Sequence, residues 1–121
     1  MIEIDQLLKV GDILNSEGTI LGLFKKKSGN LFLSSYLKDG SGEIFYSTDK
    51  ETLKKYFNSF IKLKEVYLKS NDFIVTRKFR NETTSFIKLD FVNMIQCGDS
   101  LFSENPKTMR NDKLVYEFYS L

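Results

Sequence analysis

The sequence predicts a mostly β domain that contains one helix. Three observations support this fold class. Short apolar segments alternate with turn residues in the first half of the chain, a capped amphipathic segment follows them, and further strand-like segments come after it. The chain has 121 residues, the usual length of one domain. We therefore predict a single domain over 1–121, with a core at about 10–97 and an extension over 98–121.

The first half of the chain is predicted to form a β-meander. Its three strands are expected over 19–25, 31–37 and 43–47. The turns between them, residues 26–30 and 39–42, contain Gly, Ser, Asn or Asp, which adopt turn conformations at low steric cost. Before the meander, residues 2–14 are expected to open with a short helical turn and to plug or flank the sheet.

A helix is predicted after the third strand. Thr48 and Glu51 have the T-x-x-E spacing of a capping box. Apolar residues follow at the spacing of one buried helical stripe: Leu53, Tyr56, Phe57, Phe60 and Ile61. This combination predicts one amphipathic helix that covers an apolar side of the sheet.

Strand-like segments follow the predicted helix. Two strands are expected over 64–69 and 73–79, joined by a short turn, and a further strand is expected over 85–91. Near the end of the chain, residues 114–119 are aromatic and strand-like. We expect that segment either to add an edge strand to the domain or to dock on a partner chain by strand addition.

The order of three strands, a helix and further strands is that of the OB-fold, a five-stranded Greek-key barrel that commonly binds single-stranded nucleic acid or oligosaccharide on strands two and three. The segment from Gly22 to Ile44 has a lysine-rich loop, Gly29 and the run YLKDGSGEI, with Ser41 at a position that is usually threonine. It resembles the core of nucleic-acid-binding OB domains, such as those of replication protein A, of replicative polymerase alpha subunits and of class II tRNA synthetases. The resemblance covers about 17–92 and implies that the helix closes the barrel between strands three and four.

Alternation assigns the side chains of the second strand to two faces, because successive residues point to opposite sides. The core face is predicted to hold Leu31, Leu33, Ser35 and Leu37. The resemblance places Ile44 inside as well, and Tyr46 then joins it. The opposite face carries Phe32, Ser34, Tyr36 and Phe45. Exposed aromatic residues that share one sheet face would mark a contact site.

The predicted nucleic-acid site combines this aromatic face with nearby basic residues. Residues 18–38 contain four lysines and no acidic residue, although the formal net charge of the chain is only +2. Lysines can contact phosphates while aromatic rings stack on bases; a solubilising hairpin tip is the alternative for the lysines. The candidate residues are Lys25, Lys26, Lys27, Asn30, Phe32, Ser34, Tyr36, Lys38, Phe45, Arg77 and Lys78.

The composition argues against catalysis and metal binding. The chain has no histidine and one cysteine, Cys97. It therefore lacks the residues for a catalytic nucleophile that histidine activates and for a zinc site built from several thiolates. Neither phosphate-loop motif occurs in the sequence. Asp39 and Glu43 fit turn roles better than a catalytic carboxylate pair. We expect no enzyme, no cofactor and no metal.

The expected function is the binding of single-stranded nucleic acid, DNA rather than RNA, by a small subunit of a replication, repair or telomere-type assembly. A partner subunit or homo-oligomer is expected, because three stacked bases alone would bind weakly. The lone cysteine, the lack of a signal-like amino terminus and the lack of a long apolar run predict an intracellular protein without a membrane partner. The alternative is a protein-interaction OB domain that acts as an accessory subunit or inhibitor, and oligosaccharide binding ranks third.

Overall fold

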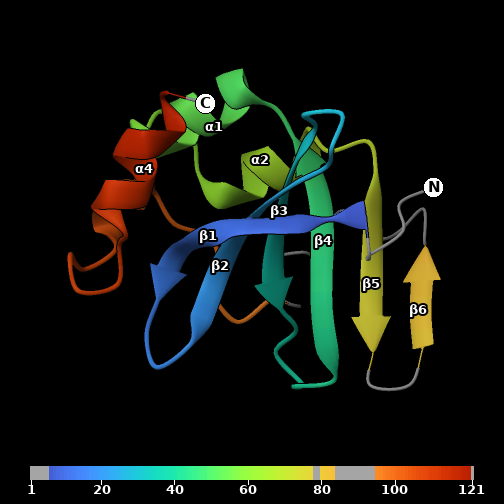
Figure 1. Cartoon of the computed structure of the whole chain (residues 1–121). Coiled ribbons are helices and arrows are strands. Elements are labelled where there is room, and N and C mark those ends of the chain that lie inside the picture. The colour runs from blue at the N-terminus through green and yellow to red at the C-terminus, as the bar shows by residue number, and fades with distance from the viewer. Residues whose placement is uncertain (1–5, 78–79, 84–94, 121) are drawn as a thin grey trace.

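The computed structural model describes residues 6–77, 80–83 and 95–120. These residues form one curved antiparallel sheet with helices on one side (Figure 1). The strands are β1 (Leu8–Asn15), β2 (Thr19–Lys25), β3 (Leu31–Tyr36), β4 (Gly42–Thr48), β5 (Phe73–Arg77) and β6 (Arg80–Thr83). The helices are α1 (Lys50–Phe57), α2 (Leu63–Leu68), the 3-10 helix η3 (Phe102–Glu104) and α4 (Asp112–Phe118).

The strands lie in the sheet in the same order as in the chain, from β1 to β6. The prediction of a mostly β domain is confirmed, and the three predicted meander strands correspond to β2, β3 and β4. In a Greek key, a later strand returns to lie beside the first strand of the meander. Here β5, the first strand after the helices, pairs with β4. The described strands therefore form a meander and not the predicted Greek-key order.

The amino-terminal segment joins the sheet as a strand from Leu8 onward; Gln6 lies in a 3-10 turn, and most of the predicted helical turn lies outside the described residues. β1 pairs with β2 in a register that is interrupted between Lys9 and Gly11 and again around Leu14. Such irregularities bend and twist a strand. In Figure 1, β1 passes in front of β3 and β4, and its first residues lie near β5. The segment thus flanks the sheet as expected, but it does so as an added strand.

Helix α1 confirms the predicted helix but begins one residue later. The N-cap is Asp49, whose Oδ1 atom accepts a hydrogen bond of 2.8 Å from the backbone N–H of Thr52. Aspartate is a strong N-cap because its side chain satisfies a free N–H of the first turn. The helix ends at Phe57, and Ser59 adopts a positive φ of 60°. Phe60 therefore lies beyond the helix and is exposed.

Two segments that were predicted as strands are helices. Residues 64–69 fall largely in α2, where Leu63, Val66 and Tyr67 are all buried at the i, i+3, i+4 spacing of a helix. Residues 114–119 fall largely in α4, whose buried residues are Leu114 and Phe118. The strand predicted over 85–91 lies outside the described residues. None of the helices among the described residues is long and apolar enough to cross a membrane.

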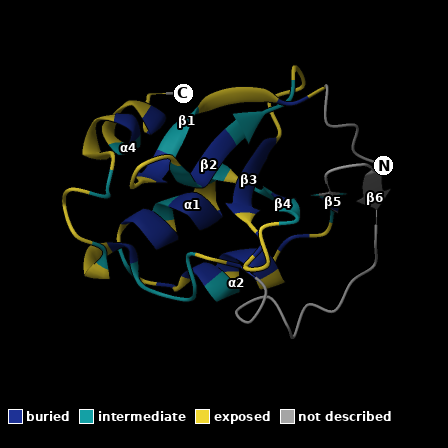
Figure 2. Cartoon of the chain, turned by 90° about the horizontal axis from the view of Figure 1, so that it is seen from below, coloured by how far each residue is buried: buried dark blue, intermediate teal, exposed yellow. Residues whose placement is uncertain are grey.

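The main hydrophobic core lies between the sheet and the helices. Figure 2 shows buried residues of α1 and α2 on the sides that face the strands. The predicted alternation is confirmed, since all six residues of the predicted core face are buried: Leu31, Leu33, Ser35, Leu37, Ile44 and Tyr46. Leu114 and Phe118 of α4 belong to the same core. The predicted extension is therefore an integral part of the domain.

Candidate nucleic-acid interface

The lysine-rich loop between β2 and β3 is tightly folded. The backbone N–H of Lys26 donates to the carbonyl oxygen of Asn30 (2.9 Å), and the N–H of Gly29 donates to the carbonyl oxygen of Lys26 (2.9 Å). Gly29 has a φ of 96°, which glycine adopts without the penalty of a side chain. These hydrogen bonds fix the backbone conformation of the loop, so its lysine side chains start from defined backbone positions.

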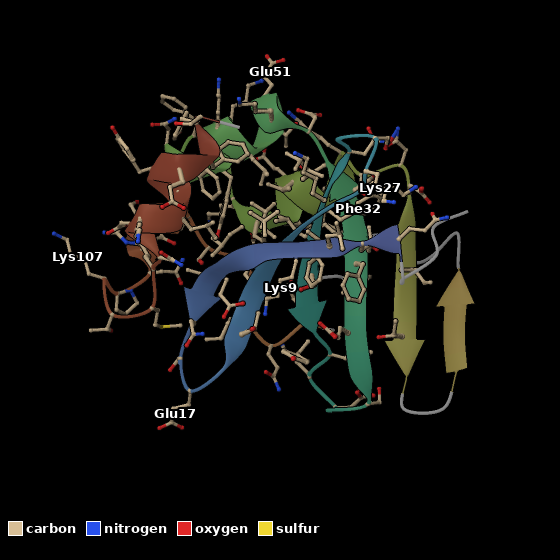
Figure 3. All side chains as sticks on the ribbon, in the orientation of Figure 1. Lys9, Glu17, Lys27, Phe32, Glu51 and Lys107 are labelled. Carbon is tan, nitrogen blue, oxygen red and sulfur yellow. The ribbon has the colours of Figure 1, made fainter. Side chains whose placement is uncertain are left out.

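The lysines of this loop differ in their surroundings. Lys25 and Lys26 are half-buried, and Lys27 is exposed. The Nζ atom of Lys26 lies over the Phe32 ring, 5.6 Å from the ring centroid, a distance at which a cation is attracted to the face of an aromatic ring. In Figure 3, Lys27 and Phe32 are labelled close together near the start of β1, whereas Glu17 lies at the opposite end of the molecule.

The β2–β3 loop contributes residues to two clefts. The first, which we call the basic cleft, has a volume of about 500 Å³ and is lined by Gln6, Leu8, Lys26, Lys27 and Ser28. Both of its charged groups are cationic, and its lining contains no carboxylate among the residues that the structure describes. Leu8 is 61% exposed and adds an apolar surface beside the two lysines. The basic cleft therefore offers positive charge next to an apolar contact.

The second cleft, which we call the polar cleft, has a volume of about 350 Å³. It is lined by Asn30, Phe32, Ser47, Thr48, Asp49, Lys69, Asn71 and Asp72. Because Asn30 belongs to the β2–β3 loop, this single loop contributes to both clefts. The remaining lining residues come from the start of β3, the end of β4, the N-cap of α1 and the connection between α2 and β5.

The far wall of the polar cleft is fixed by a hydrogen-bond network around Ser47. Its Oγ atom accepts hydrogen bonds from the backbone N–H groups of Asn71 (3.3 Å) and Asp72 (3.1 Å). The Oγ atom also lies 3.0 Å from that of Ser70, and the backbone N–H of Ser47 donates to the carbonyl oxygen of Asp72 (2.8 Å). This network anchors the turn before β5 to the end of β4.

The predicted aromatic face requires a correction. Phe32 and Phe45 lie on the face opposite to the main core, as alternation predicted, but they are only 2% and 3% exposed. They form a second hydrophobic cluster with Leu7 and Ile74, and Phe24 packs against it. Leu7 directly precedes β1, so the amino-terminal segment covers this face of the sheet. Phe32 and Phe45 are therefore not available to stack on bases.

Ser34 and Tyr36 also differ from the predicted binding roles. Ser34 is buried against Gly22 of β2, where an added Cβ atom would lie 2.6 Å from the Ser34 Oγ atom. Tyr36 is 38% exposed and is the one residue of the predicted aromatic set that reaches solvent. It lies at the far end of β3 from Leu31, a span of about 17 Å at the usual rise per residue.

Two of the other predicted basic residues, Lys38 and Arg77, belong to the end of the sheet that is distant from the β2–β3 loop. Lys38 is exposed in the turn after β3, at the Tyr36 end of the strand. Arg77 pairs with Gly42 at the same end of the sheet. Lys78 lies outside the described residues. The structure thus brings Lys26, Lys27 and Asn30 together in one region, and it places Lys38 and the Arg77 backbone elsewhere.

Sequence reasoning missed most of the polar cleft. Lys69 was predicted as the end of a strand and Asn71 and Asp72 as part of the turn after it. Thr48 was considered only for helix capping, and Asp49 was given no role. These residues come from separate parts of the chain, and only the packing of α2 against β4 unites them. No local pattern in the sequence could have grouped them.

Exposed aromatic residues also lie at α4 and in the segment that follows α1. Phe60 is 77% exposed and Tyr116 is 79% exposed. Tyr119 follows Tyr116 by three residues, and its hydroxyl oxygen accepts a hydrogen bond of 3.0 Å from Asn58 Nδ2. The Lys54 Nζ atom lies 5.6 Å from the centroid of the Tyr119 ring. We call Phe60, Tyr116 and Tyr119 the helical aromatic surface.

In the part of the chain that the structure describes, no group of three or more His, Cys, Asp or Glu residues is arranged to hold a metal ion. The two clefts and the helical aromatic surface are the features from which a function can be inferred. Comparisons with protein-family models, with curated proteins and with solved structures found no match.

Proposed function

We propose that this chain binds single-stranded nucleic acid through the β2–β3 loop. The observation that carries the proposal is the basic cleft, where Lys26 and Lys27 stand together without a carboxylate among the described lining residues. Ammonium groups in a groove attract the phosphates of a single strand, and the folded loop holds them at a defined position. The resemblance of residues 22–44 to nucleic-acid-binding OB domains favours the same class of ligand.

The proposed contact differs from a stacking platform. Bases would meet the exposed side chain of Leu8 and the amide of Gln6 instead of the buried rings of Phe32 and Phe45. Without stacking, which contributes about 1 to 3 kcal/mol per base, phosphate contacts dominate and the affinity is low. We therefore propose that the chain acts as a small subunit or oligomer within an assembly that handles single-stranded DNA.

The test is a titration of labelled single-stranded oligonucleotides with the purified protein, followed by fluorescence anisotropy. Replacing both loop lysines, Lys26→Gln and Lys27→Gln, should weaken binding. The matched control replaces two exposed lysines outside the loop, Lys107→Gln and Lys113→Gln, and so removes the same charge. Equal weakening in both variants would indicate a general charge effect, and an absence of binding by the unaltered chain at low salt would refute the proposal.

A second candidate function is protein interaction, as an accessory subunit or inhibitor. The observation that favours it is the helical aromatic surface, because exposed aromatic residues are typical of interface hot spots. Asn58 holds the Tyr119 hydroxyl in place, so part of this surface is ordered before any contact forms. If the partner is a second copy of the chain, sedimentation equilibrium should detect a dimer that dissociates in a Phe60→Ser, Tyr116→Ser variant. A monomer at all concentrations would exclude self-association through this surface.

A further inference from the structure

The polar cleft differs chemically from the basic cleft. Two carboxylates, those of Asp49 and Asp72, line it together with the amides of Asn30 and Asn71. Lys69 is the one cationic residue among the described residues that line it. Carboxylates repel phosphates and accept hydrogen bonds, so the cleft suits a neutral group that carries N–H or O–H donors. Its volume of about 350 Å³ lies within the usual range of small-ligand sites, about 300 to 1,000 Å³.

The Asp49 carboxylate in the wall of the cleft has more acceptor capacity than its capping contact uses. The Thr48 Oγ1 atom is buried, so it is not one of the acceptors that the cleft presents. Asp49 uses one carboxylate oxygen to cap α1, and an ionised carboxylate has about four acceptor positions in total. The Ser47 network holds the opposite wall in place, so these acceptors are arranged before a ligand enters.

We propose that the polar cleft recognises the edge of a nucleotide base and favours bases that carry an exocyclic amino group. This inference rests on the proposed function, because the β2–β3 loop would hold the phosphates while Asn30 of the same loop lines the polar cleft. Carboxylates accept from the N4 amino group of cytosine in known base readout, whereas they cannot donate to a carbonyl. Asn30 and Asn71 can act as donors or acceptors, so the two carboxylates set the preference.

The experiment compares oligo(dC) with oligo(dU) of equal length, each labelled and titrated with the full chain at one salt concentration. The two ligands share the same backbone and differ at two positions of the ring. At position 4 cytosine has an amino donor and uracil a carbonyl acceptor, and at N3 cytosine has an acceptor and uracil an N–H donor. We expect oligo(dC) to bind more tightly, on the order of tenfold. In the Asp49→Asn, Asp72→Asn variant this preference should fall to about one, because asparagine can donate to the uracil carbonyl.

The variant is designed to keep the fold. Asparagine is as good an N-cap as aspartate, and the hydrogen bonds that fix the turn at Asp72 involve its backbone. Asp72→Asn alone provides a second variant in which the α1 cap is unaltered. The matched control is Glu65→Gln with Glu117→Gln, which removes two exposed carboxylates from outside the cleft.

The outcomes separate this inference from the proposed function. Equal binding of oligo(dC) and oligo(dU), or a preference that survives in both cleft variants, would overturn the inference while leaving the proposed function intact. A preference that is lost equally in the control variant would also overturn it. Failure of the unaltered chain to bind either oligonucleotide at low salt would refute the proposed function and, with it, the role of the cleft.

Discussion

The Lys26 Nζ atom lies 5.6 Å from the centroid of the Phe32 ring, so a residue predicted to contact phosphate rests on a residue predicted to stack on bases. The ring belongs to the second hydrophobic cluster, beneath the segment that leads into β1. Phe32 therefore contributes to the site only indirectly, because its ring contacts the ammonium group of Lys26. Its main role is to pack in the second hydrophobic cluster.

This assignment predicts that Phe32→Ala is costly for stability. Removing a buried phenylalanine side chain leaves a cavity and usually lowers the free energy of unfolding by about 3 to 5 kcal/mol. Urea denaturation followed by circular dichroism would measure the change. Tyr36→Ala, on the same strand face but exposed, should cost clearly less. Similar losses for the two variants would contradict the burial of Phe32.

The contact between Gly22 and Ser34 gives a second prediction. An alanine Cβ atom at position 22 would lie 2.6 Å from the Ser34 Oγ atom and 3.1 Å from the Phe24 ring, so Gly22→Ala forces these side chains to move. Overpacking of this kind typically costs about 1 to 3 kcal/mol. Ser34→Ala removes the closest atom, so the double variant should recover part of the loss in a double-mutant cycle. Strictly additive effects would show that the two positions do not touch.

The C-terminal helix provides a third prediction. Phe118 is fully buried in the main core, whereas Tyr116 is exposed on the same helix. Phe118→Ala should lower the free energy of unfolding by about 3 to 5 kcal/mol. Tyr116→Ala should change it by less than about 0.5 kcal/mol, as is usual for exposed positions. Comparable thermal stability of the two variants would show that α4 is not part of the core.

Alternation along the strands predicted which side chains share a face, but it could not predict what covers each face. Every residue assigned to the core side of β3 and β4 is buried, because a two-residue period is set by strand geometry alone. Phe32 and Phe45 were placed on the correct side. Their burial depends on Leu7 and on the path of β1, which is a tertiary contact that no local pattern contains.

The helices α2 and α4 were missed for a different reason. Each has only six or seven residues, and segments of that length can satisfy both a strand and a helix pattern. The spacing of Leu114 and Phe118 and the preceding Asn111 were available as signals. The Asn111 Oδ1 atom accepts a hydrogen bond of 3.0 Å from the Leu114 N–H, the usual contact of an N-cap. The β-branched and aromatic residues of these segments outweighed those signals in the sequence interpretation.

The single cysteine yields a fourth prediction. Burial raises the pKa of the Cys97 thiol from an ordinary value of 9.0 to about 11, although a weak contact with Ser35 acts in the opposite direction. At pH 8 the native thiolate fraction is then roughly a hundredfold below that of the unfolded chain. Labelling by a thiol-specific disulfide reagent should be slow in buffer and faster by about two orders of magnitude in denaturant.

The same pKa shift fixes the sign of a pH effect on folding. The folded state holds the Cys97 proton more tightly than the unfolded state, so this contribution to stability is complete below pH 9 and is lost as the pH rises towards 11. Cys97→Ser should show a weaker loss of stability over that interval in urea titrations. Equal thiol labelling rates in native and denatured protein would contradict the burial of the thiol.

The measurement that tests the central claim most directly is the salt dependence of single-stranded oligonucleotide binding for the unaltered chain and for the Lys26→Gln, Lys27→Gln variant. Single-stranded ligands give a log-log slope of about −0.7 per phosphate neutralised, so phosphate contacts from Lys26 and Lys27 of the basic cleft predict a slope of about −1.4. The variant, which lacks both ammonium groups, should lose this part of the slope. An identical slope for the two proteins, or no saturable binding at low salt, would contradict the assignment of the β2–β3 loop as the binding site.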